Sequence, residues 1–237
     1  MPVDDAQIDN GRIELLAILA HELRSPLAAI ALAAGLLGAQ ATDLSAVEQA
    51  RALIKRQLGQ IARLTDDLLD VARIGTGKLA LRKQRIDLAS VIRMAIESLR
   101  PVIDAGIYTL IVQVPSCAVY VEADPMRLAQ VLINLIDNSA KYSERHGRIM
   151  VSVERDANEA VIRVRDKGIG IPADALPHVF DLFVQGEHSM EGSRGGLGVG
   201  LNLVKRIVGL HSGTVEAHSD GPGAGSEFIV RVPAACQ

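Results

Sequence analysis

Two long runs of apolar residues at steps of three and four constrain the fold of the first third of this chain. The apolar positions of the first run are Leu16, Leu19, Leu23, Leu27, Ile30, Ala34 and Leu37, and those of the second are Val47, Ala50, Ile54, Ile61, Leu64, Leu68 and Val71. This spacing predicts two amphipathic helices joined near residues 38–44 into a helical hairpin. Because one hairpin is too narrow to bury its own apolar stripe, we expect two to pair as a four-helix bundle in a homodimer.

A later helix is predicted to carry polar side chains along one side. Asp124 is a typical helix N-cap, with Pro125 at the first helical position. At about 100° per residue, Asn134, Asn138 and Lys141 lie in a narrow arc with Tyr142 at its edge, whereas Leu132, Ile133, Leu135 and Ile136 occupy much of the opposite side. Two asparagines alone could simply bond to nearby backbone. Joined by an amine and a phenol, they predict a polar ligand, and a nucleotide fits this set.

Three glycine-bearing segments strengthen the nucleotide hypothesis. The first holds Asp166, Gly168 and Gly170 after a predicted strand; its carboxylate could accept a hydrogen bond from an exocyclic amine while the glycines let backbone approach a flat ring. The second holds Gly196, Gly198 and Gly200 and runs through Leu201 into an amphipathic helix, whose first amides would favour phosphate oxygens. The third spans residues 221–226. Each segment alone is a weak signal, but their order and spacing together favour a nucleotide site.

Helix caps and alternating apolar residues predict the other elements of the second half. Asp87 caps a helix over residues 88–99, which Pro101 is expected to end. Strands are predicted over residues 108–114, 118–121, 149–155, 160–165, 213–218 and 228–232. They form a sheet of about five or six strands.

With these motifs the chain resembles the sensor histidine kinases of two-component signalling, from about residue 14 to residue 233. The polar helix resembles the family's N box, residues 180–183 its F box, and the three glycine segments its G boxes. The resemblance implies an α+β fold, with an N-terminal helical hairpin that forms a dimeric four-helix bundle, followed by an ATP-binding α/β sandwich whose helices cover one face of a mixed sheet. The implied domains are the dimerisation and histidine phosphotransfer hairpin (residues 11–75), a linker (76–86) and the ATP-binding catalytic domain (87–235).

The resemblance also implies ATP and Mg²⁺ as cofactors and a role for each site residue. Asn138 would hold Mg²⁺ with support from Asn134, since this cation keeps several waters and needs few protein ligands. Lys141 would meet a phosphate, and Tyr142 would lie beside the ribose or base. Asp166, in the loop of Gly168 and Gly170, would read the adenine amine. The backbone of Gly196, Gly198, Gly200 and Leu201 would approach the phosphates, and residues 186–200 would order as a lid.

The phosphoryl acceptor is also assigned by resemblance. Helical periodicity places His21 on an outward face, where most histidines are inert. However, residues 21–26 resemble the family's H box, whose histidine accepts the phosphoryl group. His21 is therefore the implied acceptor, and Glu22 the carboxylate that takes or orients the other ring proton. The basic residue that often follows the F box is absent, so either Arg194 or Lys141 is expected to supply positive charge to the phosphates.

Composition and charge limit the partners and the cellular location that we expect for this chain. A net charge of −3 without a basic run argues against nucleic acid. No charge-free apolar stretch of about 18 residues occurs, so no membrane span is expected, and a sensory module would precede this chain or act in trans. Three aspartates within the first nine residues argue against a signal peptide. Cys117 and Cys236 lack metal-ligand spacing, which predicts reduced thiols and a cytoplasmic location.

Two functions of different classes follow. The favoured one is an ATP-dependent protein-histidine kinase that autophosphorylates His21 and donates the phosphoryl group to an aspartate of a separate response-regulator receiver domain. The alternative is a nucleotide-binding dimeric scaffold without kinase activity. His21 and Glu22 favour the kinase. A mechanical ATPase of the chaperone and topoisomerase type fits less well, because it needs further domains and does not explain the H box.

Overall fold

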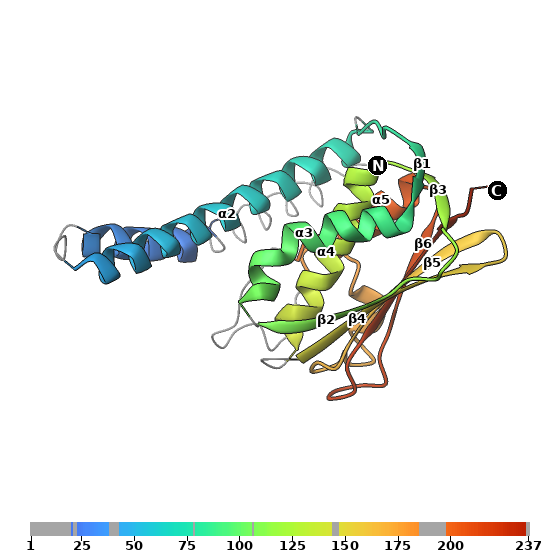
Figure 1. Ribbon diagram of the computed structural model, residues 1–237. Helices are drawn as coiled ribbons and strands as arrows, with labels where there is room; N and C mark the ends of the chain where they lie inside the picture. The colour runs from blue at the N-terminus through green and yellow to red at the C-terminus, as the bar shows by residue number, and fades with distance from the viewer. Residues whose placement is uncertain are drawn as a thin grey trace, which may run out of the picture. The chain divides into compact units, whose positions relative to one another are not determined.

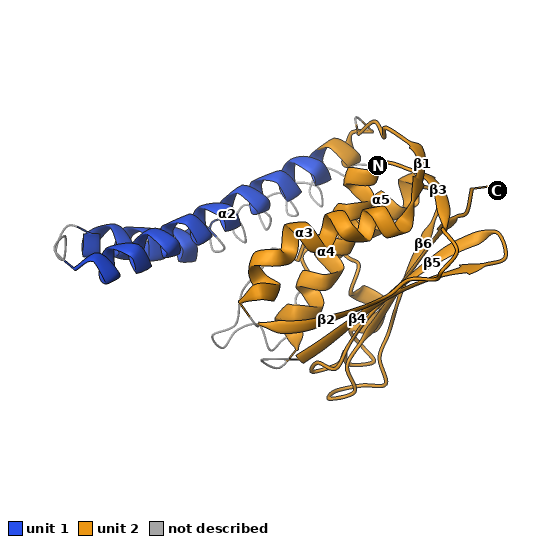
Figure 2. Cartoon of the chain, in the orientation of Figure 1, with its two compact units in different colours: residues 1–72, 195–197 blue, residues 73–194, 198–237 orange. Residues whose placement is uncertain are grey.

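The computed structural model (Figure 1) describes residues 20, 23–37, 43–77, 79–105, 107–143, 147–184 and 198–235. These residues fall into two compact units, with the boundary between Ala72 and Arg73 (Figure 2). No helix in the described ranges is long and apolar enough to cross a membrane.

The first unit is the predicted helical hairpin. Residues 23–37 form one helix, and α2 (Leu44–Gly75) forms the other. Asp43 starts α2, because its carboxylate accepts hydrogen bonds from the backbone N–H of Ser45 at 2.9 Å and of Ala46 at 3.2 Å. Small residues such as Ala33 and Ala50 are buried, whereas these large apolar side chains are exposed: Leu27, Leu32, Leu36, Leu44, Leu58 and Leu69. The hairpin alone therefore leaves much of its apolar surface uncovered.

The second unit is a mixed sheet with helices on one face. The strand order is β2 (Tyr108–Gln113), β4 (Gly147–Asp156), β5 (Glu159–Asp166), β7 (Glu227–Pro233) and β6 (Thr214–His218). β2 runs parallel to β4, and the other neighbours are antiparallel. The helices α3 (Leu88–Asp104), α4 (Pro125–Tyr142) and α5 (Gly200–Leu210) cover one face of this sheet (Figure 1). The predicted α+β class, with a helical hairpin followed by a mixed sheet, is confirmed.

Several strands differ from their predicted bounds by one or two residues, and the differences at α3 and β3 have a clear physical cause. α3 continues through Pro101 to Asp104, because a proline in the last turn removes only one backbone hydrogen bond while the half-buried Val102 and Ile103 extend the helix's packed face. The strand predicted over residues 118–121 is β3 (Tyr120–Ala123), which pairs with β1 (Gln84–Asp87) in a separate antiparallel ribbon. The pairing with β1, rather than the sequence of β3 itself, sets where β3 begins.

A buried polar cluster joins α4 to the end of α5. Asp124 caps α4 as predicted, and its carboxylate also accepts a hydrogen bond from the Arg82 N–H at 2.9 Å. His211 Nε2 accepts a hydrogen bond from the Asp124 N–H at 3.0 Å, while Nδ1 donates to the Ile207 carbonyl at 2.8 Å. Burial lowers the pKa of His211 below its ordinary value, and the nearby Lys83 charge acts in the same direction. The His211 imidazole is therefore neutral in the folded state.

We expect His211 to make the second unit less stable as the pH falls from 7.5 to 5.5. The unfolded chain takes up a proton near pH 6.5, whereas the folded chain resists protonation at His211, so acidification favours unfolding. The slope for one such proton approaches about 1.4 kcal/mol per pH unit. Urea unfolding followed by tyrosine fluorescence reports on this unit alone, because all three tyrosines (Tyr108, Tyr120 and Tyr142) lie in it. His211→Gln should flatten the pH dependence, and the exposed His218→Gln should not; equal slopes in wild type and His211→Gln would contradict the assignment.

Candidate nucleotide-binding site

The polar side of α4 is arranged as the sequence predicts. Asn134, Asn138, Lys141 and Tyr142, here called the polar row, are all half-buried. On the opposite side, Leu132, Leu135 and Ile136 are at most 1% exposed, while Ile133 is half-buried. The side-chain nitrogen Nδ2 of Asn134 is buried and has no hydrogen-bond partner among the described residues. An unpaired buried amide costs free energy, so this atom indicates a polar ligand.

The start of α5 lies beside the polar row. A Cβ atom added to Gly200 would stand 3.9 Å from Asn134 Cγ. No described side chain caps the first turn of α5, which contains Leu201, so in this part of the structure its N-terminal N–H groups have no side-chain acceptor. A helix start of this kind favours phosphate oxygens. Gly198 and Gly200 are brought to this region, whereas Gly196 lies outside the described residues.

Asp166 ends β5 as a buried acceptor that is 4% exposed. Oδ1 accepts hydrogen bonds from the Gly168 N–H at 2.8 Å and the Ser226 N–H at 3.3 Å, and Oδ2 accepts one from the Ser226 hydroxyl at 2.6 Å. These donors hold the carboxylate in one orientation. Oδ2 accepts a hydrogen bond from the Ser226 hydroxyl and can accept another from a further donor. Ser226 was not among the predicted site residues, although it ends the third glycine segment.

Gly168 and Gly170 are needed because two stretches of backbone approach each other closely. A side chain at Gly168 would clash with the carbonyl of Tyr142, and the next residue, Ile169, donates its N–H to that carbonyl at 3.0 Å. Gly170 has φ +73° and lies against the Gly221 carbonyl, with no room for a Cβ atom. The first glycine loop (residues 166–171) is therefore fixed between the end of α4 and the third glycine loop (residues 219–226). Asp166 and Tyr142 are thereby held in the same part of the fold.

Gly198 also makes a contact with protein backbone. It has φ +65°, and a Cβ atom there would lie 2.8 Å from atoms of Phe183 and Val184. The Phe183 N–H donates to the Gly198 carbonyl at 3.1 Å. Asn202 adds a second tie, since its buried Nδ2 donates to the Phe180 carbonyl at 2.9 Å while its Oδ1 accepts from Arg206 Nε at 2.8 Å. No local pattern in the sequence indicates this role for Asn202, because Phe180 lies 22 residues away.

The ammonium of Lys141 lies 4.7 Å from the centroid of the Tyr142 ring. This cation–π contact keeps a positive charge at the end of the polar row. Among the described residues, no three His, Cys, Asp or Glu side chains gather where they could hold a metal ion. Among the described residues, the site thus combines the side-chain amides of Asn134 and Asn138, the Lys141 ammonium and the N–H groups at the start of α5 with the buried Asp166 carboxylate.

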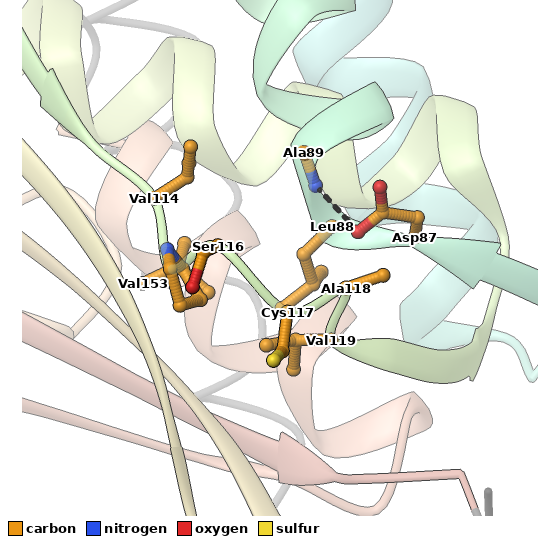
Figure 3. A pocket seen from close by; sticks show the side chains of 10 residues that line it. Asp87, Leu88, Ala89, Val114, Ser116, Cys117, Ala118, Val119 and Val153 are labelled. Carbon is orange, nitrogen blue, oxygen red and sulfur yellow. Dashed lines mark hydrogen bonds between the residues drawn. The ribbon is translucent and has the colours of Figure 1, made fainter.

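A pocket of about 200 Å³ lies elsewhere, between the start of α3 and the turn that follows β2 (Figure 3). It is lined by Asp87, Leu88, Ala89, Val114, Pro115, Ser116, Cys117, Ala118, Val119 and Val153. The Asp87 carboxylate is already engaged there, because it accepts the Ala89 N–H at 3.1 Å as the cap of α3. None of the predicted nucleotide residues lines this pocket, so it is separate from the candidate site.

The predicted acceptor His21 and its neighbour Glu22 lie outside the described residues, and their roles stay predictions. Family models nevertheless cover both halves of the chain. The His Kinase A (phospho-acceptor) domain matches residues 12–77, and the histidine kinase-, DNA gyrase B-, and HSP90-like ATPase matches residues 123–235. The chain belongs to the sensor histidine kinases. In this kinase core, the polar row, Asp166 and the start of α5 all lie inside the ATPase match, and His21 lies inside the phospho-acceptor match.

Individual relatives extend over nearly the whole kinase core. It is 34% identical over 230 residues to the circadian input-output histidine kinase CikA of Synechococcus elongatus, an alignment that covers 93% of this chain and 30% of CikA. It is 36% identical over 222 residues to the adaptive-response sensory-kinase SasA of Prochlorococcus marinus, with 92% and 58% covered. The crystal structure of full-length ShkA in complex with AMPPNP matches with a TM-score of 0.67 and 28% identity, over 94% of this chain and 46% of ShkA. The kinase core thus spans less than two thirds of each of these relatives.

Proposed function

We propose that this chain is an ATP-dependent protein-histidine kinase core that autophosphorylates His21 and passes the phosphoryl group to an aspartate of a separate response-regulator receiver domain. The observation that carries the proposal is the buried Asn134 Nδ2, which has no hydrogen-bond partner among the described residues. It lies in a row of polar side chains beside the start of α5, where no described side chain acts as a cap. A polar anionic ligand would satisfy both features at once. The ATPase match over the same residues supports ATP as that ligand.

The residues fit a nucleotide bound with its base toward Asp166 and its phosphates toward α5. Asp166 Oδ2 would accept the adenine amine, and Tyr142 would lie beside the ribose or base. Lys141, Gly198, Gly200 and Leu201 would meet the phosphates with an ammonium or with backbone N–H groups. Gly196 and Arg194 are proposed for the same purpose by resemblance alone. Phosphoryl transfer depends mainly on positioning and charge neutralisation, which this arrangement would provide.

The donor set also fits Mg²⁺. This cation prefers oxygen ligands and usually binds through phosphates, waters and one or two protein groups. Asn138 would supply one amide oxygen, with Asn134 supporting it, and the described residues hold no acidic cluster that would act as a cage for the metal. When bound, Mg²⁺ would neutralise phosphate charge during transfer.

The remaining parts of the proposal concern assembly. The exposed leucines of the hairpin, including Leu32 at 68% and Leu58 at 55%, support a homodimer in which a second hairpin covers them. The proposed domains are residues 11–75 for dimerisation and phosphotransfer, 76–86 for the linker and 87–235 for ATP binding. A cytoplasmic location, where ATP is available, is part of the same proposal.

The proposal is tested by incubating the purified chain with Mg²⁺ and γ-labelled ATP. A histidine kinase is expected to acquire label that is lost in acid and retained in alkali, whereas α-labelled ATP should leave no label. The alternative, a nucleotide-binding scaffold, predicts ATP binding by calorimetry without labelling. A chain that binds no ATP would refute both functions.

A further inference from the structure

Ser219 begins the third glycine loop, and its side chain bonds to both glycine loops near the proposed adenine site, although Ser219 belongs to none of the predicted motifs. Its hydroxyl oxygen accepts hydrogen bonds from the Ile171 N–H at 3.0 Å and the Gly221 N–H at 3.3 Å. The same hydroxyl donates to the Gly225 carbonyl at 2.7 Å. Ser219 is half-buried, so these bonds are only partly exposed to competition from water. One hydroxyl therefore connects the end of the first glycine loop to two points of the third.

Further hydrogen bonds join the two loops along their length. The Gly223 N–H donates to the Ile169 carbonyl at 2.6 Å, and the Asp166 N–H donates to the Ser226 carbonyl at 2.9 Å. Ser226 therefore holds the third glycine loop at Asp166, and Ser219 holds it at the other end, at Ile171. Gly225, with φ +75°, packs against the Asp166 carbonyl with no space for a side chain. The orientation of the Asp166 carboxylate thus depends on how the whole third glycine loop is anchored.

We propose that Ser219 is a positioning residue that gives the nucleotide site its preference for adenine. This inference rests on the proposed function, because it concerns the base end of the same site. Without the hydroxyl, the N–H groups of Ile171 and Gly221 lose their acceptor and the Gly225 carbonyl loses its donor. The loop that carries Ser226 is then held less firmly, and Ser226 orients Asp166 less well. The contact between the Asp166 carboxylate and the base is therefore weakened.

Base chemistry separates this role from a general structural one. Adenine presents an exocyclic amine that can donate to a carboxylate, whereas guanine presents a carbonyl oxygen at the same position and cannot. Loss of a well-aligned Asp166 should therefore weaken ATP binding and leave the weaker GTP binding nearly unchanged. A general loosening of the fold would lower both affinities together.

The test is the affinity of the full chain for ATP and for GTP, measured by calorimetry with Mg²⁺ present. For Ser219→Ala we expect ATP affinity to fall about tenfold, as for one lost hydrogen bond near a charged group, with GTP affinity changed less than about twofold. Ser90→Ala is the matched control, because it removes a hydroxyl that donates to the Asp87 carbonyl at 2.6 Å at the start of α3. It should keep the ATP-to-GTP ratio of the wild type. If Ser219→Ala folds incompletely, the ATP-to-GTP ratio remains measurable, since an unfolded fraction lowers the apparent affinities for both nucleotides by the same factor.

The outcomes separate the two proposals. A wild type that binds neither nucleotide refutes the proposed function itself. A wild type that binds ATP and GTP equally, or a Ser219→Ala variant that keeps the wild-type ratio or loses both affinities alike, overturns the role of Ser219 and leaves the ATP site in place. A selective loss of ATP affinity supports it.

Discussion

Replacing His21 by glutamine is expected to abolish incorporation of the γ-phosphoryl group into the chain. A glutamine amide has a similar size but offers no nucleophilic nitrogen, whereas a neutral imidazole does near pH 7. Removing the nucleophile of an enzyme costs on the order of 10⁶-fold in rate, so labelling should fall below detection. The measurement is acid-labile label from γ-labelled ATP after long incubation at saturating nucleotide.

Two controls make this result specific. His218→Gln, at an exposed position of β6, should label at the wild-type rate. His21→Gln should bind ATP as tightly as the wild type, because the nucleotide residues that the structure describes belong to the other unit. Persistent acid-labile label in His21→Gln would reject His21 as the acceptor while leaving the kinase assignment open to another histidine.

Asp166→Asn is expected to weaken ATP binding by about 30- to 1,000-fold, which corresponds to about 2–4 kcal/mol for a hydrogen bond to a buried charged group and the mismatch that replaces it. The asparagine keeps one oxygen acceptor, but its NH₂ group would face donors in either orientation. At the Oδ2 position it would face the Ser226 hydroxyl and the adenine amine, and at the Oδ1 position the N–H groups of Gly168 and Ser226. Calorimetry with ATP measures the loss, and labelling should fall with it at limiting ATP.

Asp156→Asn is the matched control for this prediction. Asp156 is an exposed aspartate at the end of β4, so its replacement makes the same chemical change away from the nucleotide residues. Circular dichroism should show that Asp166→Asn is folded, because the remaining oxygen of the asparagine still accepts a hydrogen bond from either the N–H or the hydroxyl of Ser226. ATP affinity within threefold of the wild type in folded Asp166→Asn would remove Asp166 from the site.

Features that depend on neighbouring residues were predictable from the sequence. The caps at Asp87 and Asp124 bond to N–H groups two or three residues away, so a short stretch of sequence is enough to identify them. The polar row follows from helical periodicity in the same way. The strand signals likewise predicted the mixed sheet, although β3 shifted to pair with β1.

Features that depend on distant partners were not predictable. His211 bonds to the N–H of Asp124, 87 residues away in the chain, and Ser219 bonds to Ile171, 48 residues away. Gly168 and Gly170 were expected to make room for a ligand ring, and they also make room for the carbonyls of Tyr142 and Gly221. A single sequence shows that a glycine is present but not which backbone approaches it.

The parallel pairing of β2 with β4 has a consequence for how the chain folds. Parallel neighbours need a crossover connection, and here the crossover contains α4, the helix that carries the polar row. The edge strand β2 therefore gains its hydrogen-bonding neighbour only when the segment that contains α4 has crossed the sheet, which is a non-local step. A substitution that keeps α4 from packing on the sheet would therefore cost the molecule both the pairing of its edge strand and the position of the polar row.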